Sequence, residues 1–229
     1  MDRTSLLVRS PLRFNSPCSD KRASDLVGRL CRDNARFLDL GCGWGELLLD
    51  LVAASEGATG LGVERRATYV SRARLRAVGR ALDARVSFIE GDAAAPGEPA
   101  DVVIAVGASE ALGGRTVFEK LRARMAPGAT LLFADATWVG EASADLRAAM
   151  GELPNAQALE EEAARAGLRV AYRAVSTAEE WDTFEAGWRA PFEQSEEEEA
   201  RAFGAQRKAL YEGGYRGVMG FEWWIFTAA

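Results

Sequence analysis

The sequence predicts an α/β protein whose mainly parallel β-sheet is covered by helices on both faces. Short apolar runs alternate with segments of helical period between residues 36 and 135, which is the pattern of βαβ units. Most of these runs are apolar at successive positions, as expected for strands buried on both faces. The first run, residues 37–40, passes through three alternate glycines into a helical segment. Such a turn lets the backbone approach a ligand closely.

Seven strands are expected. Five belong to the alternating part of the chain and cover residues 36–40, 59–64, 85–92, 100–109 and 129–135. A sixth strand, 168–175, alternates apolar and polar residues, as a half-buried strand does. The last strand covers residues 217–229. It contains Trp223 and Trp224, which we expect to face opposite sides of the sheet and to pack in the core.

Helical spacing is clearest in residues 19–32, where apolar residues recur three and four positions apart and Ser19 is the expected N-cap. Further helices are expected at residues 45–54, 66–82, 115–125, 155–167, 178–190 and 195–212.

We expect a single domain over residues 1–229, because typical domains contain ~100–200 residues. Residues 1–34 would form an N-terminal helical cover. Residues 176–214 would form a helical insertion or lid before the last strand.

Length and composition are those of an ordinary globular protein. The chain has 229 residues, of which 48% are hydrophobic and 27% charged, so it can bury a sizeable core. No apolar run approaches the ~18 residues of a membrane span, and the first residues do not resemble a secretory signal. We therefore expect a cytoplasmic protein without a membrane partner. A net charge of −6 argues against a nucleic-acid surface, which needs an excess of basic residues.

Histidine is absent and cysteine is sparse. Without an imidazole, Ser-His-Asp hydrolysis and histidine-ligated zinc sites are excluded. The three cysteines, Cys18, Cys31 and Cys42, have no Cys-x-x-Cys spacing. We therefore expect neither a disulfide framework nor a metal site, and we interpret all three as small buried apolar residues.

The glycine-rich turn is the stretch "DLGCGWG", with Asp39 followed by Gly41, Gly43 and Gly45. Ligands of open parallel sheets bind beyond the carboxyl ends of the strands, where this turn is expected to lie. The dinucleotide fingerprint G-x-G-x-x-G would need its third glycine at position 46, which is Glu46. The carboxylate of Asp39 would repel a pyrophosphate, whereas it suits a ligand with an ammonium group and a sulfonium cation. A tight turn without a ligand is the alternative interpretation.

The pattern D-x-G-x-G-x-G resembles the first motif of the class I S-adenosylmethionine-dependent methyltransferases. The resemblance continues in order at later strand ends: at Glu64, in "IEGDAA" at residues 89–94, and in "DVVIAVGAS" at residues 101–109. It implies S-adenosylmethionine as the cofactor and S-adenosylhomocysteine as its product. It also implies a Rossmann-like, doubly wound sheet of seven strands, the last of which is antiparallel.

The resemblance further implies how the cofactor is held. The two oxygens of Glu64 would take both ribose hydroxyls, Asp92 would bind the adenine amino group, and the Ala93 N–H would face an adenine ring nitrogen. Val106 and Gly107 would pass under the methionine part. The complete set of expected cofactor-binding residues is Asp39, Gly41, Cys42, Gly43, Glu64, Arg65, Asp92, Ala93, Val106 and Gly107.

The stretches "FNSPCSDK" (14–21) and "GASEALGG" (107–114) are similar to a subgroup of that family that methylates small molecules. This similarity implies a small-molecule substrate, for instance a secondary metabolite. Expected substrate-binding residues are Phe14, Trp138, Trp181 and Trp188. Trp181 and Trp188 also share a helical spacing with Phe184, so they fit the buried stripe of a helix equally well.

Methyl transfer from a sulfonium is an in-line displacement that mainly requires a positioned nucleophile. Because histidine is absent, any general base would be a carboxylate or a tyrosine. The candidates are Glu110, just past the fourth strand, and Asp135, at the end of the fifth. Glu110 could instead be an acid near a helix N-cap, and Asp135 could be satisfied by backbone N–H groups. Ala136 follows Asp135, so the Asp-Asn pair of metal-dependent catechol methyltransferases is missing and we expect no metal.

Two other functions stay open on the sequence alone. One is a non-catalytic S-adenosylmethionine-binding sensor or scaffold. The other is an NAD(P)-dependent reductase, which the glycine spacing disfavours. The acceptor atom, which could be nitrogen, oxygen or carbon, and the oligomeric state are also left open.

Overall fold

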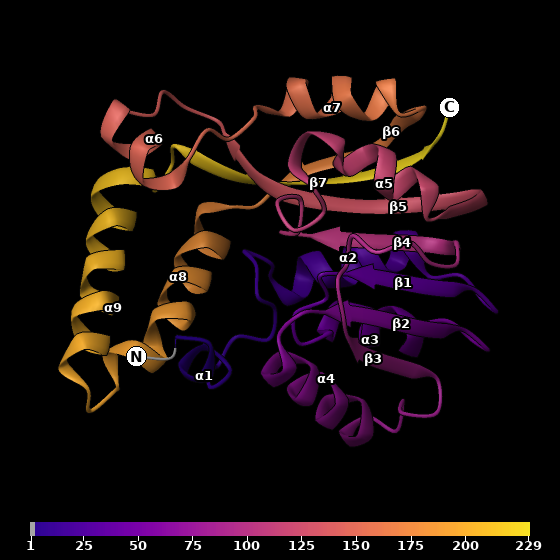
Figure 1. Cartoon of the computed structure of the whole chain (residues 1–229), viewed down its shortest axis with the longest axis horizontal. Helices are drawn as coiled ribbons and strands as arrows, with labels where there is room; N and C mark the ends of the chain where they lie inside the picture. The colour runs from indigo at the N-terminus through magenta and orange to yellow at the C-terminus, as the bar shows by residue number, and fades with distance from the viewer. Residues whose placement is uncertain (1–2) are drawn as a thin grey trace.

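The computed structural model describes residues 3–229, and it confirms the predicted fold class. One seven-stranded sheet has the order β3-β2-β1-β4-β5-β7-β6 (Figure 1). β7 runs antiparallel to both of its neighbours, and the pairs formed by β1 to β5 are parallel. The strands are β1 Arg36–Leu40, β2 Thr59–Glu64, β3 Val86–Glu90, β4 Ala100–Val106, β5 Met125–Trp138, β6 Leu168–Val175 and β7 Met219–Ala228.

Strand β5 is longer than the expected 129–135. Its register against β4 shifts after the pair Ala100 and Met125, which lets the Pro-Gly turn sequence remain within the strand as a bulge. At the other end, β5 pairs with the long antiparallel β7 as far as Trp138. The expected strand ends at residues 91–92 and 107–109 lie in loops instead, which leaves those residues free to face a cavity.

The described chain contains nine α-helices. They are α1 Arg3–Leu7, α2 Asp20–Leu30, α3 Glu46–Ala53, α4 Ala67–Gly79, α5 Val117–Ala123, α6 Ala144–Met150, α7 Ala156–Arg165, α8 Ala178–Glu193 and α9 Glu198–Leu210. A 3₁₀ turn, Gly114–Thr116, precedes α5, and a π-turn, Tyr211–Tyr215, follows α9. Ser19 caps α2 as expected, since its side chain accepts a hydrogen bond from the N–H of Arg22. Helix α1 lies within the expected N-terminal helical cover, whereas the short helix α6 was not expected.

Two hydrophobic clusters pack on opposite faces of the sheet. Residues of α2, α3, α4 and α8 contribute to one cluster, and residues of α5 and α7 contribute to the other. Trp223 belongs to the first cluster and Trp224 to the second, so the expectation that these neighbours face opposite sides is confirmed. The cysteines are all free, but Cys31 is exposed, and the expectation that all three are buried is wrong. Cys31 is the residue that follows helix α2, at its C-cap position.

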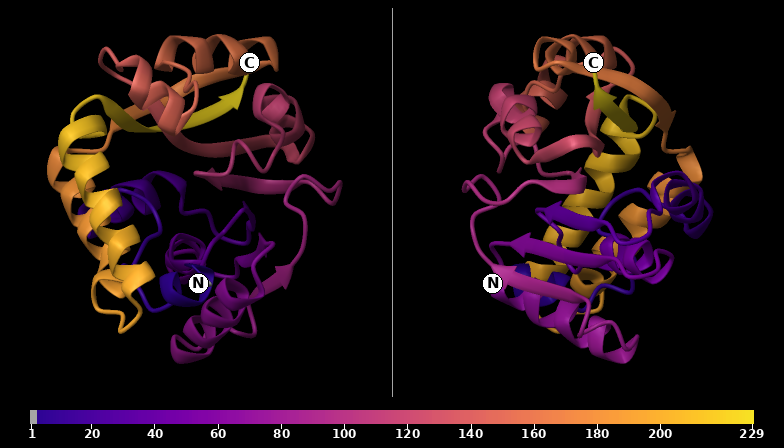
Figure 2. Two further views of the ribbon diagram at one scale, coloured as in Figure 1. Left: turned by 60° about the vertical axis from the view of Figure 1, so that its left-hand side comes forward. Right: turned by 90° about the vertical axis from the view of Figure 1, so that its right-hand side faces the viewer.

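Helices α8 and α9 pack against each other at one side of the sheet, next to the N-terminal helix α1 (Figure 2). The guanidinium of Arg3 lies over the ring of Phe203 on α9, 3.9 Å from its centroid. The ends of the chain that we expected to act as cover and lid therefore meet in space. Within residues 3–229, no helix has the length and apolarity that a membrane crossing requires.

Candidate functional site

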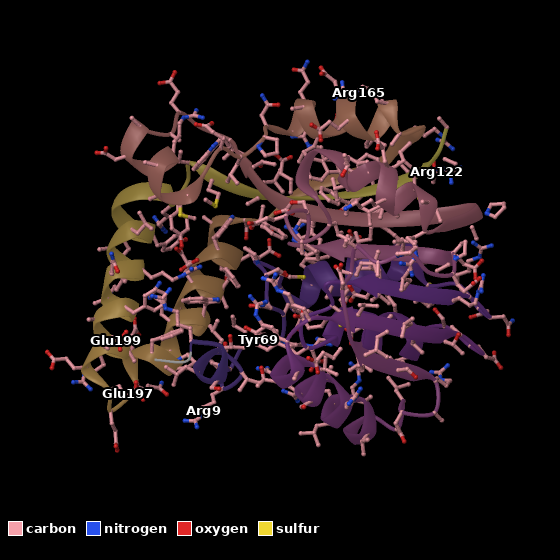
Figure 3. The ribbon with its side chains drawn as sticks, viewed as in Figure 1. Arg9, Tyr69, Arg122, Arg165, Glu197 and Glu199 are labelled. Atoms are coloured by element: carbon pink, nitrogen blue, oxygen red, sulfur yellow. The ribbon has the colours of Figure 1, made fainter. Side chains whose placement is uncertain are left out.

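A cavity of about 430 Å³ opens at the carboxyl ends of β1, β2, β3 and β4. All ten expected cofactor-binding residues line it: Asp39, Gly41, Cys42, Gly43, Glu64, Arg65, Asp92, Ala93, Val106 and Gly107. Residues that sequence reasoning did not identify complete its wall, among them Arg13, Asn15, Ser16, Tyr69 and Trp223. Tyr69, on α4 and labelled in Figure 3, lines this cavity.

The glycine turn between β1 and α3 depends on glycine for two physical reasons. Gly41 and Gly45 have φ angles of +81° and +76°, which L-residues with a side chain rarely adopt. A Cβ on Gly41 would also lie 2.7 Å from the Cβ of Ala108, and one on Gly45 would lie 2.3 Å from the Phe88 ring. The turn therefore presents bare backbone to the cavity.

Glu64 ends β2 and links it to the glycine turn. Its Oε2 accepts a hydrogen bond from the N–H of Gly43 at 3.2 Å, and its Oε1 accepts one from the N–H of Arg66 at 2.9 Å. Each carboxylate oxygen has a further lone pair. The buried Glu64 side chain can therefore accept two more hydrogen bonds from a ligand in the cavity.

Asp39 is buried at the end of β1, and the described chain provides no hydrogen bond or ion pair to its carboxylate. Burial raises the pKa of Asp39 to about 8, and the negative charge of Glu64 adds to this shift. Two buried acids that face the same cavity favour a cationic ligand, which would relieve their repulsion. This charge pattern and the bare glycine turn fit S-adenosylmethionine and do not fit a pyrophosphate.

Asp92 lies in the loop after β3, in an exposed position at the rim of the cavity. Its Oδ1 accepts a hydrogen bond from the N–H of Ala94 at 2.9 Å, which fixes the side chain within its own loop. The second carboxylate oxygen remains available for a donor such as an amino group.

The two candidate catalytic acids occupy different positions. Glu110 lines the cavity, whereas Asp135 does not. Asp135 accepts hydrogen bonds from the N–H groups of Ser109 at 3.1 Å and Ala136 at 2.7 Å, while burial raises its pKa. Asp135 therefore holds the loop that carries Glu110. Its geometry fits the alternative of a carboxylate satisfied by backbone, and a catalytic role for either acid stays a prediction.

The four expected substrate-binding aromatics are not brought together. Phe14 lines the cavity, but the three tryptophans do not. The Trp181 ring packs against Phe184 and stacks on Tyr211, and Trp188 stacks on Phe192. Such contacts are typical of apolar side chains on the buried face of a helix, which the helical spacing of Trp181 and Trp188 also predicted.

Trp138 lies away from this helix face, at the end of β5, with the Arg147 guanidinium 5.8 Å from the centre of its ring. Two other tryptophans, Trp44 and Trp223, do reach the cavity wall. No local pattern distinguished Trp223 from a core residue.

A second cavity of about 790 Å³ lies between the N-terminal loop and the first turns of α2 and α8. Arg13, Phe14, Ser16 and Cys18 line both cavities, so this loop is a shared wall. The two spaces together could hold a donor and an acceptor on either side of residues 13–18.

Comparisons with known proteins agree with this geometry. A family model described as a methyltransferase domain matches residues 32–198. The uncharacterized protein YjhP of Escherichia coli strain K12 is 33% identical over 141 residues, which are 59% of this chain. In that match the chain spans only 56% of the length of the curated relative.

Solved structures are similar over nearly the whole chain. The X-ray structure of YjhP from E. coli has a TM-score of 0.87 at 25% identity and covers 99% of this chain and 100% of its own. A SAM-dependent methyltransferase from Geobacter sulfurreducens, in complex with S-adenosyl-L-homocysteine, has a TM-score of 0.89 at 24% identity, with coverage of 100% and 99%. At such identities the structural likeness shows the fold.

Proposed function

The chain belongs to the methyltransferase-domain family, and on that premise we propose that it transfers a methyl group from S-adenosylmethionine to a small molecule. The observation that carries the proposal is the convergence of the expected cofactor-binding residues in one cavity at the strand ends. They come from four separate segments of the chain. The complex of the Geobacter sulfurreducens relative with S-adenosyl-L-homocysteine supports the same assignment.

In this proposal, each part of the cavity lining has a distinct role in binding the cofactor. The glycine turn admits the cofactor close to the backbone, and Asp39 places a negative charge beside its cationic end. Glu64 accepts hydrogen bonds from the ribose, and Asp92 accepts one from the adenine amino group. Bound S-adenosylmethionine supplies a methyl group already activated on a sulfonium, so the chain mainly has to hold the acceptor in line.

The acceptor is expected to approach from the side of residues 13–18, where the second cavity adjoins the first. An amine or hydroxyl acceptor is our first choice, because carboxylates and aromatic rings in the combined lining suit amines and polar groups. Glu110 is the acid in this lining that is nearest in sequence to the methionine segment, and it is the proposed base where the acceptor must lose a proton.

A transfer assay with methyl-labelled S-adenosylmethionine and a metabolite extract tests this function. Label that moves into a small product supports the methyltransferase. A chain that binds S-adenosylhomocysteine tightly yet moves no label into any fraction of several extracts would support the cofactor-binding sensor or scaffold instead. Binding of NAD but not S-adenosylhomocysteine would favour the reductase.

A further inference from the structure

We propose that residues 8–16, called the strap below, close over the bound donor and are fastened there by Arg72 and Trp44. The inference rests on the proposed function, because strap residues Arg13 to Ser16 form part of the wall of the cavity assigned to the donor. Arg72 and Trp44 are then positioning residues that set how long the donor stays bound.

Arg72, on α4, holds three carbonyl groups of the strap. Its Nη1 donates to the carbonyl oxygens of Val8 at 2.9 Å and Ser10 at 3.2 Å, and its Nη2 donates to that of Leu12 at 2.7 Å. The chain turns at residues 8 and 9, directly after α1, so the three carbonyl groups converge on one forked guanidinium. Within residues 3–229, Arg72 forms no salt bridge. Its charge is therefore satisfied mainly by the strap.

Trp44 connects the strap to the glycine turn. Its indole Nε1 donates to the carbonyl oxygen of Arg13 at 2.5 Å, and the Arg72 guanidinium lies 4.0 Å from the centre of its ring. The ring also packs edge-on against Tyr69, which lines the cavity. A ligand that orders the glycine turn thus also orders the side chain that anchors the strap.

The far side of the strap rests on α8. The Ser10 hydroxyl donates to the carbonyl oxygen of Gly187 at 2.9 Å, and Leu12 packs so closely on Gly187 that a Cβ there would lie 2.5 Å from its Cδ2. The preceding helix α1 contributes no buried residue, and Arg9 is exposed and points outward (Figure 3). Arg13 of the strap also forms ion pairs with Asp20 and Asp50. The strap is therefore held by side-chain contacts and is not part of any strand, so it can open without unfolding the sheet.

The test compares Arg72→Lys with Arg74→Lys. Lysine keeps the positive charge, but its single ammonium group cannot donate to all three carbonyl groups as the forked guanidinium does. Arg74 is a matched control on the same helix, since its guanidinium also donates to a backbone carbonyl, that of Phe88, which is not part of the strap. We expect S-adenosylhomocysteine to dissociate about tenfold faster from Arg72→Lys, and within twofold of the wild-type rate from Arg74→Lys, as measured by stopped-flow tryptophan fluorescence.

Limited trypsin digestion gives a second readout that needs no turnover. In the wild type, S-adenosylhomocysteine should slow cleavage after Arg9 and Arg13, and this protection should be largely lost in Arg72→Lys. Equal dissociation rates and equal protection in both variants would overturn the strap proposal while leaving the proposed function intact. No binding of S-adenosylhomocysteine by the wild type would overturn both.

Discussion

At the scale of single residues, the buried carboxyl group of Asp39 has a strongly raised pKa. Its carboxyl is buried without a partner, and its pKa is raised to about 8 by burial, with a smaller contribution from Glu64. In the absence of ligand it therefore holds a proton at neutral pH. A bound ammonium or sulfonium group would favour the ionised form and release that proton.

The affinity for S-adenosylhomocysteine should therefore rise with pH up to about 8. At still higher pH the free ligand loses its own ammonium proton, so the affinity should fall again. Calorimetry in buffers of different ionisation enthalpy should detect proton release on binding at pH 6.5. Asp39→Asn should abolish this release and weaken binding about tenfold. Release that persists in the variant would assign the proton to another group.

The same substitution should have the opposite effect on the stability of the unliganded protein. An acid whose folded pKa is raised destabilises the fold progressively as pH rises from its unfolded value near 4 to its folded value near 8. At pH 9, Asp39→Asn should accordingly unfold at a higher temperature than the wild type, with a gain of about 1–3 kcal/mol. A lower melting temperature at pH 9 would show that Asp39 is stabilised by contacts of its own.

Glu64 offers a comparison with a matched neighbour. Glu64 and Glu90 are register partners on the adjacent strands β2 and β3, but only Glu64 lines the cavity. Glu64→Gln leaves one acceptor oxygen where two are needed, so S-adenosylhomocysteine affinity should fall tenfold or more. Glu90→Gln should change it less than twofold. Equal effects in a binding titration would place the ribose elsewhere.

The strand-end residues were predictable because each belongs to a short local pattern. Asp39, Glu64 and Asp92 could be found in this way. Arg72 and Trp44 could not, because their partners lie far away in sequence: Arg72 bonds to carbonyls 60 to 64 positions away, and Trp44 bonds to one 31 positions away. Contacts of this kind leave no local trace in a single sequence.

At the scale of elements, the turn from β1 into α3 should tolerate no side chain at Gly41. Gly41→Ala combines a left-handed φ with a Cβ only 2.7 Å from that of Ala108, so it should lower the free energy of unfolding by about 1–3 kcal/mol. Gly28→Ala is the control, because Gly28 lies within helix α2 and has nothing within 4 Å of an added Cβ. It should raise stability by about 0.5–1 kcal/mol. Chemical denaturation of both variants measures the difference.

Element boundaries were predictable where the signal was local, and strands β1, β2 and β6 have the bounds that the sequence predicted. The helix beginning after Ser19 was placed within two residues at each end. Strand β5 was underestimated, because its ends are set by pairing with β7 and by a bulge, neither of which depends on local composition. In helix α8, the spacing of Trp181 is compatible with both a core position and a substrate-binding position. Only its contacts in the structure, such as the stacking on Tyr211, distinguish the two.

At the scale of the whole molecule, Glu180 connects helix α8 to the N-terminal helix α2. It accepts hydrogen bonds from the backbone N–H groups of Ser19 and Thr177 and from the guanidinium of Arg22, so one carboxylate binds the first turns of α2 and α8. Burial opposes the charge, but these hydrogen bonds dominate and lower the pKa of Glu180 to about 2.

Because the folded pKa of Glu180 is depressed, its stabilisation is complete above the unfolded pKa near 4.5 and is lost as pH falls towards 2. Glu180→Gln should lower the melting temperature at pH 7, and the gap to the wild type should close between pH 4.5 and pH 2. Glu179→Gln, at the exposed neighbouring position, should have little effect. A gap that stays constant down to pH 2 would mean that the charge of Glu180 contributes nothing.

The global topology was predictable mainly through the family resemblance. The βα alternation indicates a parallel sheet, but nothing local in residues 217–229 requires β7 to insert between β5 and β6. This insertion places Trp223 at the cavity wall and brings α8 beside the N-terminal strap. The acceptor side of the site therefore depends on contacts between distant parts of the chain, and the donor side depends on local motifs.

The central claim is that one cavity at the carboxyl ends of β1, β2, β3 and β4 holds S-adenosylmethionine. A crystal structure of the complex with S-adenosylhomocysteine tests it most directly. The account predicts ligand density along the glycine turn, with the ribose hydroxyls on Glu64 and the adenine amino group on Asp92. Density for the ligand away from these three elements, with Glu64 and Asp92 both out of contact, would contradict it.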